Sequence, residues 1–317
     1  MHYTIRHITK FAYESPISES VMEARMQPRS DGTQHCIRFG LGTMPSSRAR
    51  MYQDSDGNIV HHFNIPGRHS RLEVTAEAFV ECEPPAALPE SLGPDAWERI
   101  DAATASGVFW DVLNASPFAR RTELLDELAL EMGLGRHADP IACVRRIMGD
   151  LFTRFEYVPK STRVDSPIDD ALSSRQGVCQ DFSHIMIALV RQLGIPCRYV
   201  SGYLFQPGDK AERSLDGATH AWLEAWLLDL GWVGFDPTHN ILTDEHHIRV
   251  AVGRDYADVP PTRGVFKGQS VVRSELAVGV SVGTTQVYSN PTAFVPWMSS
   301  EAPSPLPDAD ASQQQQQ

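Results

Sequence analysis

The chain has 317 residues, of which 42% are hydrophobic and 21% are charged, a composition typical of a globular protein with a sizeable core. Its length fits one large domain or two of medium size. The formal net charge of -12 argues against nucleic-acid binding, because proteins of that class usually carry a basic face that neutralises phosphates.

The start of the chain, MHYTIRHITKFAYES, alternates polar and apolar residues and has no apolar stretch of signal-peptide length. No run of about eighteen apolar residues occurs anywhere, so we expect no membrane span. Without an export signal, we expect reduced thiols and a cytoplasmic location. The cysteines form an odd and sparse set: Cys36, Cys82, Cys143, Cys179 and Cys197.

Residues 1–83 are predicted to form a β-rich N-terminal domain. The segment HYTIRHITKFAY alternates with period two, and so do the apolar positions from Leu72 to Val80. Between these segments, Asp56-Gly57-Asn58 predicts a hairpin turn. An antiparallel sandwich or barrel is the simplest arrangement for this region.

Residues 84–155 are predicted to be a linker followed by a helical segment of the core. Residues 83–96 contain four prolines and mark the boundary. Within residues 116–133, Leu124, Leu125, Leu128 and Met132 lie on one helical face, and Gly133 is a plausible stop. A second helix is expected within 138–157, with Asp139 as its cap and Pro140 in its first turn.

Residues 156–290 are predicted to form the catalytic core together with C-terminal strands. An apolar stripe indicates a helix from Cys179 to Leu193, ended by Gly194. A strand is expected at 197–205, and two antiparallel strands at 219–238 around a turn at 229–231. The low-complexity tail, 291–317, is predicted to be disordered at its end.

Cys179 lies at the start of this expected helix. Unpaired backbone N–H groups and the helix dipole favour a thiolate at such a position. Free cysteines are also among the most buried residues, so position alone does not separate a nucleophile from a structural thiol. Cys143 and Cys197 have no comparable signature nearby, and we interpret both as packing residues.

The segments that follow provide an imidazole and a carboxylate. His220 is on the first strand of the expected hairpin and Asp236 is at the end of the second. Pairing through the turn at 229–231 would bring these two residues within hydrogen-bonding range. A thiol, an imidazole that shares its proton and a carboxylate that orients the imidazole together make a cysteine nucleophile.

The segments GVCQDFSH, THAWLEAWL and GWVGFDPTHN resemble the core of the transglutaminase-like superfamily. The resemblance implies an α+β, papain-like fold, in which the cysteine-bearing helix packs on an antiparallel sheet, preceded by a β-sandwich-like N-terminal domain. It also implies a triad with Cys179 as nucleophile, His220 as base and acid, and Asp236 as the orienting carboxylate. Residues 1–83 and 246–268 are similar to segments of a bacterial branch of transglutaminase-like cysteine peptidases.

The resemblance has departures around the nucleophile. Papain-like proteases place an oxyanion-hole glutamine six residues before the cysteine, where this chain has Ser173. The backbone N–H of Cys179 is therefore the safer oxyanion donor. Candidate substrate-binding residues are Tyr157, Gln176 and Trp222, with core packing as the alternative for Tyr157 and Trp222.

No metal or cofactor is predicted. Animal transglutaminases use calcium, but the loop DSDGN lacks the glycine and glutamate positions of a calcium loop. Adjacent histidines on a strand point to opposite faces, so we expect His61-His62 and His246-His247 on a solvated surface. Asp181 is expected to serve the helix dipole, and His184 to be structural.

Three interpretations of function remain open. The first is a thiol enzyme that forms a thioester from an amide of a peptide or protein substrate. Water would make it a peptidase or amidase, which we favour, and an amine would make it a transamidase. The second is a catalytically silent scaffold or peptide-binding protein, although all three triad positions are occupied. The third is an acyl-CoA-dependent N-acetyltransferase, which the flanking segments disfavour. The oligomeric state is not predicted.

Overall fold

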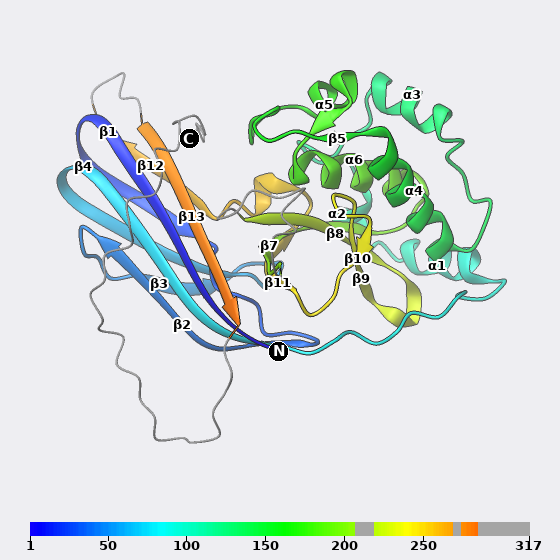
Figure 1. Ribbon diagram of the computed structural model, residues 1–317, viewed down its shortest axis with the longest axis horizontal. Coiled ribbons are helices and arrows are strands. Elements are labelled where there is room, and N and C mark those ends of the chain that lie inside the picture. The colour runs from blue at the N-terminus through cyan, green and yellow to red at the C-terminus, as the bar shows by residue number, and fades with distance from the viewer. Residues whose placement is uncertain (207–218, 269–273, 285–317) are drawn as a thin grey trace.

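The computed structural model describes residues 1–206, 219–268 and 274–284, which form a β-rich part and a mixed helical and β part that pack side by side (Figure 1). The β-rich part is one six-stranded antiparallel sheet with the order β12-β1-β4-β2, in which β13 also pairs with β1 and β3 with β4. Its strands are β1 (His2–Ala24), β2 (Gln34–Met44), β3 (Arg50–Gln53), β4 (Ile59–Cys82), β12 (Thr262–Lys267) and β13 (Ser274–Thr284).

Two long strands, β1 and β4, run through both halves of this sheet. Register shifts between Ala12 and Glu19 interrupt their pairing and divide the sheet into two halves. Residues from both halves, including Phe63 and Val74, share one buried cluster, which gives the single sheet its sandwich-like core. The predicted alternation from Leu72 to Val80 and the hairpin between β3 and β4 are both confirmed.

The C-terminal strands lie in the N-terminal sheet and not with the core, where we had expected them. β12 pairs with the second half of β1, and β13 pairs with the first half. Together they cover the edge of β1 that β4 leaves open, which would otherwise present a long row of unpaired backbone groups. The chain therefore begins and ends its described part in the same sheet. The predicted tail lies outside the described residues.

The mixed part is built on a five-stranded antiparallel sheet with the order β10-β9-β8-β7-β11. Its helices gather on one side of the sheet (Figure 1). None of the helices in the described ranges combines the length and apolar character needed to cross a membrane. The strands are β7 (Cys197–Leu204), β8 (His220–Trp226), β9 (Trp232–Asp236), β10 (Ile241–Leu242) and β11 (His247–Gly253).

The helices and short elements of this part surround the central helix α6 (Cys179–Gln192). The expected caps of α4 are confirmed, since Asp139 accepts from the backbone of Ile141 and Pro140 begins the helix. The other helices and short elements are α1 (Ala96–Thr104), α2 (Trp110–Leu113), α3 (Glu123–Glu131), α4 (Pro140–Arg154), α5 (Ile168–Ser174), β5 (Glu156–Tyr157), β6 (Gln176–Gly177), η1 (Leu228–Leu230) and η2 (Tyr256–Asp258).

Helix α6 is fixed at both ends. At its start, the Asp181 carboxylate accepts from the backbone N–H of Val178 at 2.8 Å and from the hydroxyl of Thr162. At its end, the buried Arg191 guanidinium donates to backbone carbonyls that include those of Cys197 and Arg254. A buried cation that is surrounded by carbonyl acceptors avoids the cost of an unpaired charge. The helix start, which carries Cys179, is therefore held in place.

The two parts join along the outer edge of β11. The side-chain amide of Asn58 pairs with the backbone of Val252, donating and accepting at 2.8 Å in each direction. The side-chain amide of Gln34 likewise donates to the backbone carbonyl of Arg249 at 2.8 Å and accepts from its backbone N–H at 2.7 Å. These amides replace the neighbouring strand that the edge of β11 lacks.

We expect Asn58→Ala to lower the free energy of unfolding by about 1–3 kcal/mol, because it leaves buried backbone groups of Val252 without partners. Asn64→Ala is the matched control, since Asn64 lies on β4, the strand that follows Asn58, and its amide makes an exposed bond to Glu19. Denaturant unfolding followed by circular dichroism measures both. Equal destabilisation by the two variants would contradict this role of Asn58.

Candidate active site

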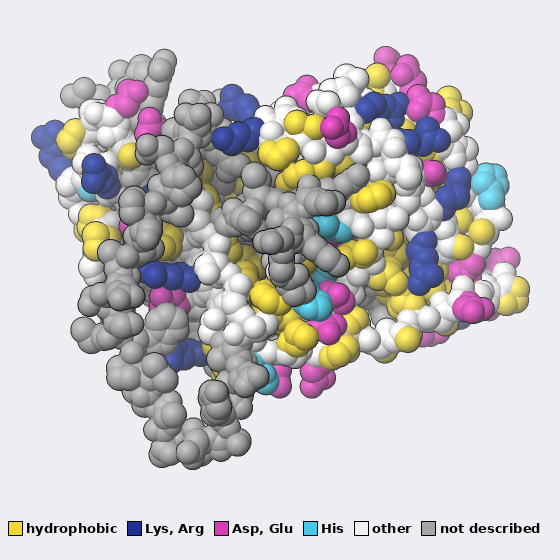
Figure 2. Space-filling model, in the orientation of Figure 1, with side chains coloured by type: hydrophobic (Ala, Val, Ile, Leu, Met, Phe, Trp, Pro, Cys, Tyr) yellow, Lys and Arg dark blue, Asp and Glu magenta, His cyan; other side chains and the backbone are white. Residues whose placement is uncertain are grey.

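Four elements converge on one cluster of polar side chains. The start of α6 contributes Cys179, the start of β8 contributes His220, the end of β9 contributes Asp236, and the start of β11 contributes His247. On this face of the molecule, histidine and acidic side chains gather near the boundary of the two parts, bordered by hydrophobic ones (Figure 2). The predicted triad residues are thus brought together by the fold.

The cysteine and the histidine contact each other. Cys179 is the first residue of α6, partly exposed, and its side chain interacts with the imidazole of His220, whose pKa it raises. Since Nε2 of this imidazole faces Asp236, we place Nδ1 toward the thiol. The first N–H groups of a helix have no partners within the helix, so an anion at Cys179 has electrostatic support there.

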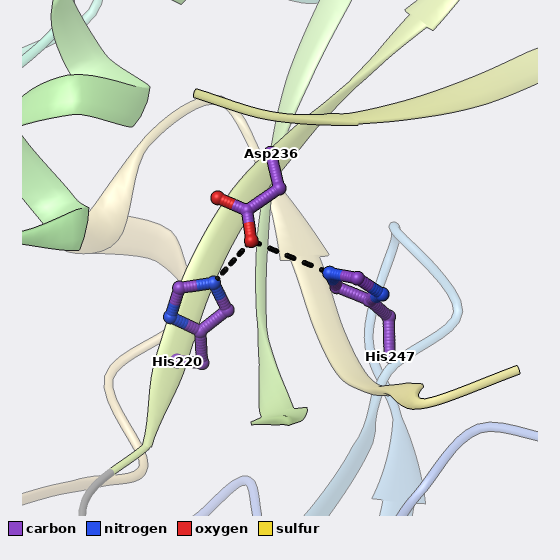
Figure 3. Close-up of side chains that lie close together, drawn as sticks. All are labelled: His220, Asp236 and His247. Carbon is purple, nitrogen blue, oxygen red and sulfur yellow. Dashed lines mark hydrogen bonds and ion pairs between the residues drawn. The ribbon is translucent and has the colours of Figure 1, made fainter. Parts of the chain in front are cut away.

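The hairpin register accounts for the contact between histidine and carboxylate. Leu223 pairs with Phe235 across β8 and β9. Continuing this register places Asp236 opposite Trp222, diagonal to His220, within reach of a side-chain contact. The His220 Nε2 to Asp236 Oδ2 distance is 2.8 Å (Figure 3). The catalytic roles of the three residues remain a prediction.

The Asp236 carboxylate has no exposed surface and is surrounded by donors. Its Oδ2 contacts His220 and, at 3.3 Å, His247 Nε2 (Figure 3). The same oxygen lies 2.7 Å from His239 Nδ1. Its Oδ1 accepts from the backbone N–H of Thr238 at 2.9 Å. Burial alone would raise the pKa of Asp236, but the charge of His220 and the hydrogen bonds hold it well below its usual range.

The two buried imidazoles beside Asp236 have raised pKa values. Burial alone would lower the pKa of His220, but the Asp236 carboxylate and the thiolate of Cys179 outweigh burial and raise it. The same balance raises the pKa of His247, through its hydrogen bonds to Asp236 and Asp244. Both imidazoles therefore favour the protonated, cationic form.

Sequence reasoning missed two members of this cluster, His239 and His247. We had expected His247 on a solvated surface, and this is wrong: its side chain is 1% exposed. His61, in the other histidine pair, is also buried. Alternation along a strand indicates that neighbours point to opposite faces, but it does not tell which face another element covers. His239 could have been suspected from its position three residues after Asp236.

The weaker site predictions have different outcomes. Trp222 is fully buried beside Val200 and Val252, so it lies behind the imidazoles and does not line a substrate cleft. Gln176 is engaged on the surface, where its amide donates to Glu156 at 3.1 Å. Tyr157 is partly buried against the core, and the pairing of β5 with β6 puts it beside Gly177, two residues before Cys179. Substrate contacts of Gln176 and Tyr157 remain predictions.

Three other residues near the site have structural partners. The Asp181 carboxylate accepts the backbone N–H of Val178, the residue before α6, and burial raises its pKa to about 6 despite the bonds from Thr162 and Val178. His184 accepts from the backbone of Tyr256 at 3.2 Å, and burial lowers its pKa to about 3, so it is neutral and structural as expected. Ser173 donates to a backbone carbonyl of its own helix and does not replace an oxyanion-hole glutamine.

A metal ion could in principle use the nitrogen and oxygen atoms of His220, Asp236 and His247, which lie within 4.8 Å of one another. In this arrangement the carboxylate oxygen itself sits where the imidazoles converge, at hydrogen-bonding distance from each of them. The carboxylate is also held by the backbone of Thr238. The geometry is that of a hydrogen-bonded cluster and not of ligands around an open central point.

Comparison with known sequences places the chain in a family. The family model of the transglutaminase-like superfamily matches residues 128–237, and that of the bacterial transglutaminase-like N-terminal region matches residues 3–81. A Mycobacterium leprae protein described only as uncharacterised is 33% identical over 87% of this chain and 96% of its own length. The chain therefore belongs to the transglutaminase-like superfamily.

Two further comparisons concern a named relative and a solved structure. A protein-glutamine gamma-glutamyltransferase of Pseudomonas aeruginosa is 30% identical over 73% of this chain, which corresponds to 35% of that protein. The crystal structure of a candidate cysteine protease from Cytophaga hutchinsonii superimposes with a TM-score of 0.66 at 21% identity. That match covers 91% of this chain and 92% of the other. The structural likeness confirms the predicted fold class.

The pKa shifts predict how the cluster contributes to stability at each pH. The lowered pKa of Asp236 stabilises the fold at pH values above 3.8, the ordinary pKa of this carboxyl group. The raised pKa of His220 stabilises the fold fully at pH values below 6.5, the ordinary pKa of histidine. We therefore expect Asp236→Asn to reduce the thermal midpoint most between about pH 4 and 6.5, with a cost of about 3–5 kcal/mol for breaking a buried charge pair.

The difference in midpoint between wild type and Asp236→Asn should shrink below this window, as the carboxylate gains a proton, and above it, as the histidines lose theirs. Asp229→Asn is the control, because Asp229, on η1, forms an exposed ion pair with Arg99 of α1. Thermal unfolding by circular dichroism from pH 3 to 9 measures all three proteins. A difference independent of pH would contradict the assigned charges.

Proposed function

We propose that this protein is a thiol enzyme that acts on amide bonds of peptide or protein substrates through a thioester. One observation carries the proposal: the partly exposed Cys179 interacts with the imidazole of His220, and that imidazole hydrogen bonds to the buried carboxylate of Asp236. In this arrangement a proton can move between thiol and imidazole while the carboxylate stabilises the imidazolium.

The residues support both halves of an acyl transfer. The Cys179 thiolate attacks the amide carbonyl carbon, and the oxyanion that forms accepts a hydrogen bond from the backbone N–H of Cys179. His220 then gives its proton to the departing amine as the C–N bond breaks, leaving a thioester. Water or an amine attacks the thioester carbon and gives a proton to His220. The C–S bond then breaks, and His220 returns the proton to the sulfur of Cys179.

The acceptor of the acyl group decides the reaction. Hydrolysis needs only water and gives a peptidase or amidase, which we favour; transamidation needs a bound amine. The Cytophaga hutchinsonii structure is that of a candidate cysteine protease, and the Pseudomonas aeruginosa relative is a glutamyltransferase. Both reactions use the same three residues, so a product experiment must separate them.

The alternative is a catalytically silent scaffold or peptide-binding protein. Such a protein needs no reactive thiol. The interaction between Cys179 and His220 favours the enzyme, because a silent site has no need for a thiol beside a buried, charge-stabilised imidazole.

We expect iodoacetamide to label Cys179 alone near neutral pH. Burial raises the pKa of Cys36 and Cys82 to about 11 and that of Cys197 to about 12, while Cys143 is buried within α4. Peptide mapping by mass spectrometry measures the labelling of each thiol.

His220→Gln should slow the labelling of Cys179 about tenfold or more, since the thiolate loses its partner. Cys36→Ala is the control, because Cys36 is the other cysteine with partial exposure and lies on β2 of the N-terminal sheet. Labelling of Cys179 no faster than that of Cys143 in the folded protein would refute the thiol mechanism.

The reaction itself is tested with a glutamine-containing peptide library, with and without an added primary amine. Cleavage, deamidation and amine incorporation give distinct mass changes. We expect cleavage or deamidation with wild type and none with Cys179→Ala. If no product depends on Cys179 in either condition, the scaffold is the better description.

A further inference from the structure

We infer that His247 is a positioning residue: it links the Asp236 carboxylate to a second carboxylate, Asp244, and as an imidazolium sets the pH range in which Cys179 and His220 form their ion pair. This inference rests on the proposed function and names how the same site is regulated. It extends the series of side-chain interactions beyond the triad to five residues: Cys179, His220, Asp236, His247 and Asp244.

His247 lies between two carboxylates. Its Nε2 is 3.3 Å from Asp236 Oδ2, and its Nδ1 is 2.9 Å from Asp244 Oδ1. The indole ring of Trp222 contacts the imidazole edge-on, with ring centroids 5.3 Å apart. The imidazole is almost wholly buried, whereas the Asp244 side chain is 42% exposed. The chain of contacts therefore connects a buried site with a carboxylate at the surface.

This geometry favours a positive charge on His247. A neutral imidazole could accept from the backbone N–H of Asp244, 3.2 Å from Nδ1, but could donate to only one of the two carboxylates. Only an imidazolium donates to both carboxylates. The titratable groups that face it are Asp236 from β9, Asp244 from the turn before β11, and His220 from β8. Two carboxylates against one imidazole outweigh the repulsion from His220.

His239 contacts the same carboxylate oxygen but differs from His247. It is partly exposed, and its second ring nitrogen lies 3.2 Å from the neutral amide of Gln206. A neutral His239 can therefore satisfy both of its contacts. Of the two histidines added to the triad, His247 is the one whose surroundings call for a cation.

The charge on His247 affects both members of the ion pair. A fixed cation beside Asp236 favours loss of a proton from each nearby group, so it promotes the thiolate at Cys179 and eases the release of the proton from His220. Without it, the charge of Asp236 would act more strongly on His220, and the imidazolium would hold its proton too firmly to serve well as an acid.

Two variants and a matched control test this inference. His247→Gln keeps a donor toward Asp236 without the charge, and Asp244→Asn removes the partner that stabilises the charge. His246→Gln is the control, because His246 Nδ1 also contacts Asp244, at 3.0 Å, but His246 does not contact Asp236. Circular dichroism establishes that each variant is folded.

The first readout is the pH dependence of the alkylation rate of Cys179, which needs no substrate. We expect the pH of half-maximal rate to rise by about one unit in His247→Gln, to rise by less in Asp244→Asn, and to stay unchanged in His246→Gln. The pH limits of kcat/KM should move the same way on any substrate that is turned over. A lower rate with an unchanged profile in His247→Gln would mean a merely structural role and would overturn the inference.

The second readout is the protonation of the imidazole ring, measured by nitrogen NMR on wild type and on Cys179→Ala. We expect both ring nitrogens of His247 to carry a proton at pH 7–8 in both proteins. A neutral His247 would overturn the inference even if the enzyme is active. A charged His247 with a shifted alkylation profile, but no product from any peptide, would retain the inference while rejecting the proposed function.

Discussion

The burial of one carboxylate organises the site. Asp236 has no exposed surface, and a buried ionised carboxylate is tolerated only when its oxygen atoms accept hydrogen bonds and its charge is balanced. Three imidazoles and a backbone N–H provide these partners. Because the imidazoles come from β8, from the residues after β9 and from β11, satisfying this carboxylate requires all three regions to be in place at once.

The N-terminal sheet takes part in this requirement. Its Gln34 and Asn58 amides cap the outer edge of β11, the strand that begins with His247. Strands β12 and β13, which follow the core in the sequence, pair with β1 in the same sheet. The N-terminal sheet is therefore built from segments that come before and after the core. The β-rich part therefore helps to hold β11, and with it His247, in position. It is not a separate module attached by a linker.

Local patterns were sufficient for much of the structure. The apolar stripe and the stop at Gly194 predicted α6, and the turn at 229–231 predicted the hairpin that brings Asp236 near His220. Each depends on residues close together in the chain. The failures depend on residues far apart: β13 pairs with β1, more than 250 residues earlier, and His247 is buried by strands that are distant in the chain.

His247 illustrates the difference between what local patterns predict and what depends on long-range packing. Its position in a strand follows from the alternation of β11, and its orientation opposite to His246 follows from the pleat of a strand. Its burial does not, because it depends on β9 placing Asp236 on that side and on the N-terminal sheet holding β11 there. The family and the three residues of the predicted triad can be recognised in short segments of the chain, since the motifs depend on residue order and spacing. The second carboxylate–imidazole pair exists only after distant strands have packed, since hydrogen bonds and charge balance in a buried cluster depend on distance in space and not along the chain.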